Sequence, residues 1–188
     1  MKKVRHILLM AALIASLAVP ASAAAPSPAP PQITVTQTTD AMRWAVDNKL
    51  IPQTVEGSAP VTHQLIAETL YRLGGSPRVT GCHFSDLRVG TDGWDAARWA
   101  VDAGALFMYD DGAFAPQNTV TRMELARAMR RYAHGIGSEQ DVYRSCASWA
   151  LDVGVLAFDA DGALRTETTA SVWDFAQALY NVCAYYRK

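Results

Sequence analysis

The chain has 188 residues, and its 17 lysines and arginines are nearly balanced by 18 aspartates and glutamates. The resulting net charge of −1 excludes the strongly basic surface that non-specific binding to nucleic acids or anionic membranes requires. Any acidic ligand would therefore have to be bound by a local arginine site. The length is sufficient for one ordinary domain.

Residues 1–23 have the pattern of a signal peptide. Lys2, Lys3 and Arg5 precede an apolar run, and a small-x-small cleavage pattern ends at Ala23. The apolar run is short for a membrane span, and no cysteine follows it that would carry a lipid, although an uncleaved anchor is the alternative. Removal of these residues leaves 14 basic and 18 acidic residues, a net charge of −4. We expect an exported protein.

Residues 24–32 are predicted to form a linker. Four prolines alternate with small residues in this stretch. Such a composition favours an extended polyproline II conformation and cannot form a core. The folded part is therefore expected to begin at about Ile33.

Three helix–loop–helix units are predicted after the linker, because the sequence repeats itself. The segment that begins at Ala41 matches the one at Ala96, and the segment at Trp99 matches the one at Trp149. One such unit cannot bury its apolar stripe alone, so we expect the units to share a core. An open helical solenoid is the alternative that the same periodicity allows. The units span residues 33–76, 82–135 and 136–188.

The middle unit carries the clearest local signals. Its first helical pattern begins at Trp94, and an Asp-Gly turn and Pro116 interrupt the helical periodicity in the loop that follows. Thr121 and Glu124 then form the pattern of a capping box, in which each side chain binds a backbone N–H of the other residue. The second helix is therefore expected to begin at this point.

This unit resembles the S-layer homology module of bacterial cell-surface proteins. The resemblance implies an all-α fold in which three helix–loop–helix repeats surround a pseudo-threefold axis and a central helix bundle. It also implies non-covalent anchoring to the bacterial cell wall by binding of an acidic secondary cell-wall polysaccharide. The residues that carry the resemblance are Phe84-Ser85-Asp86, Trp94, Asp111-Gly112-Ala113-Phe114-Ala115-Pro116 and Val120-Thr121-Arg122-Met123-Glu124, where Met123 replaces the alanine of the family's Thr-Arg-Ala-Glu tetrad.

Arg122 is the main candidate for ligand binding. A cation in the first turn of a helix is disfavoured by the helix dipole unless an anion lies nearby. The guanidinium and free N–H groups of the helix start would grip a carboxylate together. The resemblance implies that this arginine binds acidic groups of the polysaccharide, such as a pyruvate ketal. The alternative is a structural arginine paired with Glu124 or with an acid of a neighbouring loop.

The other candidates are grouped with Arg122 in one groove of the middle unit. The resemblance implies that Trp94 lines the groove, whereas packing at the helix start is an equally good interpretation. The outer repeats are degenerate at the arginine position, which is His63 in the first repeat and Val172 in the third. His63 is therefore a weaker candidate. The remaining predicted ligand residues are Asp111, Gly112, Thr121 and Glu124.

No catalytic, cofactor or metal site is expected. The nucleophile elbow, the zinc-protease motif and the phosphate loop are all missing from the sequence. Asp159-Ala160-Asp161-Gly162 resembles the start of a calcium loop, but the later ligand positions do not match. Cys82-His83 alone is a poor basis for a zinc site.

A disulfide between Cys146 and Cys183 is predicted, because the two ends of an antiparallel helical hairpin are neighbours and export permits oxidation. Three buried thiols that pack as small apolar residues are the alternative. In sum, we predict an exported bacterial cell-wall or cell-surface protein whose partner is a secondary cell-wall polysaccharide. The alternative function is a surface protein-interaction or assembly module with degenerate glycan grooves.

Overall fold

The computed structural model of the protein describes residues 35–134 and 143–186. Within these ranges the fold is helical and has no strands, which confirms the predicted all-α class. The predicted signal peptide, residues 1–23, and the linker, residues 24–32, lie outside the described residues. The helices are α2 (Val35–Asp47), α3 (His63–Leu73), α4 (Trp94–Asp102), α5 (Arg122–His134), α6 (Tyr143–Val153) and α7 (Val172–Tyr185).

Capping boxes fix the start of two helices, and the sequence predicts the one at α5. At α5, the Thr121 hydroxyl accepts from the Glu124 N–H at 3.2 Å, and the Glu124 carboxylate accepts from the Thr121 N–H at 2.7 Å. At α7, Ser171 and Asp174 form the same reciprocal pair. These bonds satisfy backbone donors that the first turn of a helix otherwise leaves without partners.

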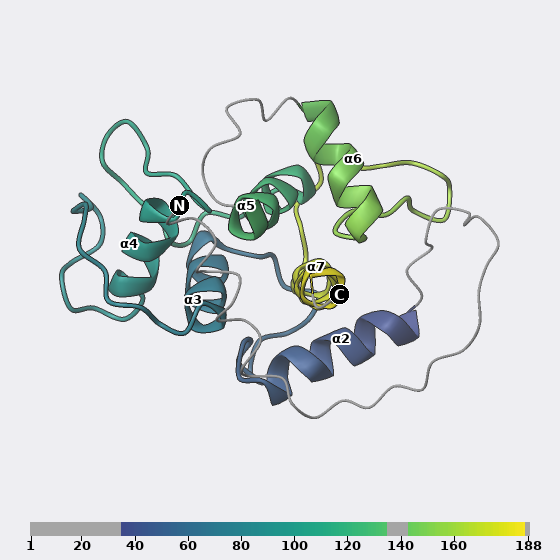
Figure 1. The fold of residues 1–188 in the computed structure, drawn as a ribbon, viewed down its shortest axis with the longest axis horizontal. Coiled ribbons are helices and arrows are strands. Elements are labelled where there is room, and N and C mark those ends of the chain that lie inside the picture. Colours follow the sequence, from purple (N-terminus) through teal and green to yellow (C-terminus); the bar gives the residue numbers. More distant parts are fainter. Residues whose placement is uncertain (1–34, 135–142, 187–188) are drawn as a thin grey trace.

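Helices pair between units rather than within them. The second helix of one unit packs on the first helix of another, which gives the pairs α3 with α4, α5 with α6, and α7 with α2. Figure 1 looks along α7, with α2 below it and α5 and α6 above it. The first and last helices of the described chain are thus in contact, which is not expected for an open solenoid.

The segments before the three second helices are joined by a ring of backbone hydrogen bonds. Val61 N–H donates to Ala170 O at 2.9 Å, Ala170 N–H donates to Val120 O at 2.9 Å, and Val120 N–H donates to Val61 O at 3.1 Å. All three residues are buried. Since an unpaired buried N–H is costly, each unit depends on the other two to complete its hydrogen bonding.

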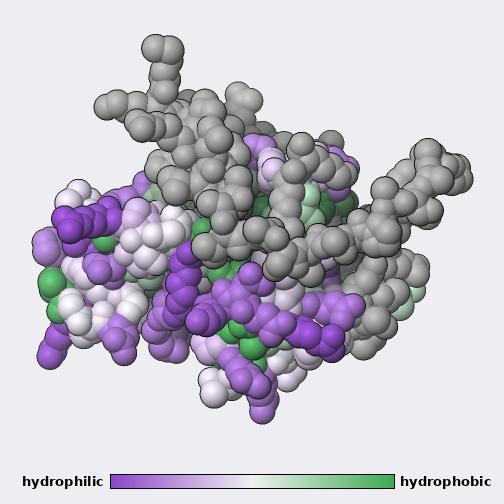
Figure 2. Space-filling view, turned by 60° about the horizontal axis from the view of Figure 1, so that its bottom comes forward, coloured by the Kyte–Doolittle hydropathy of each residue, from purple (hydrophilic) through white to green (hydrophobic). Residues whose placement is uncertain are grey.

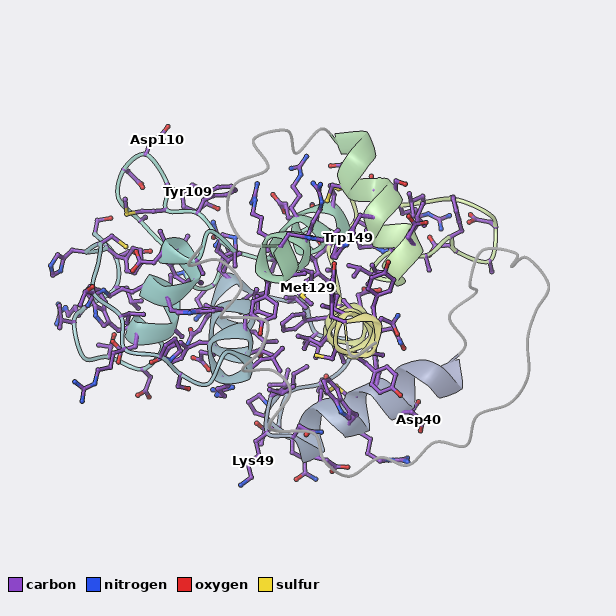
Figure 3. All side chains as sticks on the ribbon, viewed as in Figure 1. Asp40, Lys49, Tyr109, Asp110, Met129 and Trp149 are labelled. Atoms are coloured by element: carbon purple, nitrogen blue, oxygen red, sulfur yellow. The ribbon has the colours of Figure 1, made fainter. Side chains whose placement is uncertain are left out.

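The core consists of the apolar stripes of the second helices. Equivalent positions in α3, α5 and α7 are each at most 1% exposed. Figure 3 shows Met129 between α5 and α7. Helices that are too short to be stable alone are thus held by a shared apolar interior. These core residues are Ile66, Leu70, Leu125, Met129, Phe175 and Leu179.

The predicted disulfide is not formed in the structure. None of Cys82, Cys146 and Cys183 is joined in a disulfide, and the last two are buried in the core. The prediction assumed that α6 and α7 pack closely as a hairpin. Instead α7 packs chiefly on α2 and α6 packs chiefly on α5, so the two helices share few contacts. The thiols occupy the core as small apolar side chains.

A histidine lies where the ends of α5 and α7 approach α6. The Tyr186 hydroxyl is 2.8 Å from His134 Nε2 and accepts from Trp149 Nε1 at 3.3 Å. Burial, and to a smaller extent the charge of Arg130, lower the pKa of His134. The folded chain therefore binds fewer protons than the unfolded chain just below the ordinary histidine pKa of about 6.5.

We expect the protein to lose stability as the pH falls from 7 to 5. The stability that neutral His134 contributes is present above the unfolded pKa and is lost as the pH falls through the lowered folded pKa. The effect should be small, because the side chain is partly exposed. Melting temperatures of the parent and of His134→Gln over this range measure it. If the melting temperature fell equally in the parent and in His134→Gln, the role of His134 would be contradicted.

Candidate functional site

The loop before each second helix docks on the start of another second helix. At α5, the Arg122 N–H donates to Thr168 O and the Met123 N–H donates to Thr166 O, both at 2.9 Å. The crevice beside Arg122 therefore lies between the second and third units. The equivalent bonds elsewhere are His63 N–H to Asn118 O, Gln64 N–H to Pro116 O, Val172 N–H to Ala59 O and Trp173 N–H to Gly57 O.

The helix start at Arg122 offers no free N–H groups to a ligand. The first two N–H groups are used by the docked loop, and those of Glu124 and Leu125 bind Thr121. This corrects the prediction that the arginine fork and the helix start grip an anion together. Of these groups, only the guanidinium is left to contact a ligand.

A cavity of about 280 Å³ lies beside the Arg122 side chain. Its wall is built from Arg122 of α5, the loop residues 157–160, and Trp173, Asp174 and Gln177 of α7. The loop contributes the partly exposed ring of Phe158. The cavity thus combines a cation, carboxylates and two aromatic side chains, which suits a polar ligand with a ring-shaped body.

Arg122 is held by the neighbouring loop rather than by Glu124. Its Nη2 donates to Ala157 O at 2.9 Å, and its Nη1 lies 3.3 Å from Asp159 Oδ1. The side chain is only 13% exposed. The alternative of an arginine paired with an acid of a neighbouring loop is therefore what the structure shows, although the guanidinium still lines the cavity.

Asp159 belongs to a small charge network. Its second oxygen pairs with Arg165, which also pairs with Asp161. The N–H of Ala163, together with the Arg165 guanidinium, holds the pKa of Asp161 below its usual value. The positive charges of two arginines thus offset the negative charges of two aspartates at the edge of the cavity.

Gln177, a residue of the cavity wall, has a buried acceptor without a hydrogen-bond partner. Asn181 Nδ2 donates to Gly154 O at 2.7 Å, so Asn181 Oδ1 is the end that accepts from Gln177 Nε2 at 2.9 Å. This chain of bonds fixes the orientation of the Gln177 amide. Its Oε1 is buried and has no hydrogen-bond partner, and the residue as a whole is 6% exposed. A buried acceptor in this state carries a free-energy cost that a hydrogen-bond donor would relieve.

Trp94 does not line this cavity. It is 3% exposed and packs edge-on against Phe84, with ring centroids 5.5 Å apart. His83 and the guanidinium of Arg98 lie against the same ring. The interpretation of Trp94 as packing at the helix start is the one that the structure supports.

Asp111 and Gly112 form a turn in a different place from Arg122. The Asp111 carboxylate accepts from the Ala113 N–H at 2.9 Å, and Gly112 has a φ of 81°, which favours glycine. The Ser85 N–H donates to Gly112 O. This loop docks on α3 of the first unit, so the predicted single groove with Arg122 is wrong. Thr121 and Glu124 do not line the cavity either and are bonded to each other as a cap.

His63 faces the loop of the middle unit. Its Nδ1 hydrogen-bonds to Phe114 O at 3.1 Å, and its ring stacks on Tyr109 with centroids 6.0 Å apart. Figure 3 shows Tyr109 in the loop between α4 and α5. His63 therefore occupies, toward the second unit, the position that Arg122 occupies toward the third.

Asp86 holds the loop of the middle unit in place. Its two carboxylate oxygens accept from the Phe114 and Ala115 N–H groups at 2.8 and 2.7 Å. Ala115 has a φ of 51°, a conformation that needs such support in a residue with a Cβ. The Phe-Ser-Asp sequence thus has a structural role.

We expect Asp86→Ala to destabilise the fold by about 1–2 kcal/mol, because two charge-assisted bonds are lost at an exposed site. Urea unfolding of the two proteins measures the difference. Asp92→Ala is the matched control on an exposed aspartate of the same connection between α3 and α4, and it should change stability by less than about 0.5 kcal/mol. Equal effects of the two substitutions would contradict a structural role of Asp86.

Sequence comparison agrees with the geometry of the middle unit. Residues 83–126 match the family model of the S-layer homology domain. This stretch of the chain is similar to that domain. Such domains generally anchor proteins to the cell wall, typically through secondary cell-wall polymers, and they are not catalytic modules. No curated protein matches the chain.

The S-layer homology match ends before the residues that complete the cavity. It includes Arg122 and the capping box, whereas Asp159, Trp173 and Gln177 lie beyond it. These three residues were missed by sequence reasoning. They come together with Arg122 only because each loop docks on a helix of another unit. No pattern in the sequence shows this docking.

Within residues 35–134 and 143–186, no helix is long and apolar enough to cross a membrane. Nor does any group of three or more His, Cys, Asp and Glu side chains in those ranges have the placement of a metal site.

Proposed function

We propose that this protein attaches non-covalently to the cell wall by binding an acidic secondary cell-wall polysaccharide, for example a pyruvylated one, in the cavity beside Arg122. The observation that carries the proposal is an arginine guanidinium in the wall of a cavity that also contains Trp173 and Phe158. A guanidinium binds a carboxylate by a charge-assisted fork, and flat aromatic rings pack against the apolar face of a sugar. The S-layer homology match over residues 83–126 supports it.

We further propose that the three helix–loop–helix units are repeats related by a pseudo-threefold axis. The hydrogen-bond ring of Val61, Val120 and Ala170 supports this arrangement, because each member donates to the equivalent residue of another unit. The three isolated β-bridges join the same segments. A closed triplet satisfies its own buried groups and needs no second chain to cover its core.

A second candidate function is a surface protein-interaction or assembly module. Three consecutive residues of the loop between α4 and α5 are exposed although they are large and apolar, namely Phe107, Met108 and Tyr109. The coloured part of the surface drawn in Figure 2 is mostly hydrophilic or of intermediate hydropathy, with small separate hydrophobic areas. The face drawn there therefore offers mainly polar groups to a partner, which favours the glycan over a broad apolar interface.

A sedimentation assay tests the proposed function. The chain without residues 1–23 is mixed with purified bacterial cell walls, either intact or stripped of their secondary polysaccharide. We expect co-sedimentation with the intact walls alone. Equal binding to stripped walls would favour the interaction-module function, and absence of binding to both would overturn polysaccharide anchoring.

A further inference from the structure

The carboxylate of Asp159 occupies the place that a ligand carboxylate would need. Its Oδ1 lies 3.3 Å from Arg122 Nη1, and the Ala157 carbonyl takes Nη2. Because the Arg122 side chain is 13% exposed, there is little room for a second anion beside Asp159. A ligand anion must therefore replace Asp159 at the guanidinium rather than join it.

Asp159 has a second cation that can hold it. Its Oδ2 pairs with Arg165, which is more exposed than Arg122 and also pairs with Asp161. If Asp159 left Arg122, its charge would remain compensated by Arg165. The arrangement therefore permits release of Arg122 without leaving an aspartate unpaired.

An aspartate at the position of Asp159 occurs where the facing helix begins with an arginine, Arg122. In the loop of the middle unit, Tyr109 and Ala115 stand at the positions of Asp159 and Arg165. That loop faces His63 instead of an arginine. The aspartate and its second arginine are therefore present at the junction that contains Arg122 and missing from the one that contains His63.

We propose that Asp159 is an internal competitor for Arg122, which an acidic ligand displaces toward Arg165. The proposal rests on the proposed function, because it takes the Arg122 cavity as the ligand site. It makes Asp159 a specificity-determining residue. A weakly bound carboxylate cannot displace it, so the ligand must gain further contacts in the cavity, such as those with Trp173 and Gln177.

Asp159→Asn tests the proposal, because it keeps the shape of the side chain and removes its charge. The probes are the pyruvate ketal of a methyl hexoside and the corresponding neutral methyl hexoside, titrated by calorimetry. We expect the variant to bind the acidic probe about fivefold or more tightly than the parent does, with no change for the neutral probe. Asp110→Asn is the matched control, at a solvent-facing tip of the other loop (Figure 3), and it should bind both probes like the parent.

The double variant Arg122→Ala/Asp159→Asn separates competition from a structural effect. With the arginine removed, Asp159→Asn should no longer tighten binding. Parent-like or weaker binding of the acidic probe by Asp159→Asn, while Arg122→Ala loses binding, would overturn the competitor role and leave the proposed function standing. If neither the parent nor Asp159→Asn binds the acidic probe or the intact walls, both proposals are wrong.

Discussion

Arg122→Ala is expected to weaken binding to polysaccharide-bearing cell walls at least tenfold. Loss of a charge-assisted contact costs about 1.5–3 kcal/mol, and about 1.4 kcal/mol corresponds to a factor of ten in affinity. The substitution also removes the bonds to Ala157 O and Asp159, so it should cost roughly 1 kcal/mol of folding stability. Co-sedimentation isotherms at a temperature well below melting measure the binding loss separately.

Arg127→Ala provides the control for that experiment. Arg127 lies on the same helix and carries the same charge, but it is not part of the cavity wall. We expect wall binding within about twofold of the parent, since a remote surface charge acts only through screened long-range attraction. If Arg122→Ala bound like the parent, or if both variants lost binding equally, the assignment of the cavity as the ligand site would fail.

Local features of this fold could be predicted from the sequence because they depend on residues close together in the chain. The capping box of Thr121 and Glu124 spans three residues and is formed as expected. The helix beginning at Trp94 and the turn at Asp111-Gly112 are likewise set by nearby residues. The shared core was also predictable, because the apolar stripes of equivalent helices align.

The composition of the candidate site could not be predicted, because it depends on how one unit docks on the next. Arg122 and Asp159 are 37 residues apart, and no sequence motif links them. The motif that contains Arg122 also contains Asp111, so sequence proximity grouped these two residues in one groove. The structure separates them, since backbone bonds attach each loop to the helix start of another unit.

Trp94 shows a second limit of sequence reasoning. A tryptophan at a helix start suits both a ligand groove and a packing role, and the sequence does not choose between them. Phe84 decides the outcome, because its ring and that of His83 cover the indole and leave 3% of the residue exposed. The same argument applies to Cys146 and Cys183, because whether they can form a disulfide depends on which helices pair.

Phe175→Ala is expected to destabilise the protein by about 3–5 kcal/mol. Phe175 is fully buried near the start of α7, the helix that packs on α2, α5 and α6. Truncation removes apolar contacts and leaves a cavity among helices of all these units. Against a typical stability of about 5–15 kcal/mol, the melting temperature should fall by roughly 10 °C or more. Thermal denaturation followed by far-ultraviolet circular dichroism measures it.

Phe107→Ala is the matched control, because Phe107 is 61% exposed and contacts the guanidinium of Arg131 at 4.1 Å. It should cost no more than about 1 kcal/mol, the value of a cation–π contact at an exposed site. Both variants should melt in one transition, because the ring of Val61, Val120 and Ala170 and the pairing of α2 with α7 prevent any unit from unfolding alone. A separate early transition in Phe175→Ala, with part of the helical signal retained, would show that the three units do not form one cooperative core.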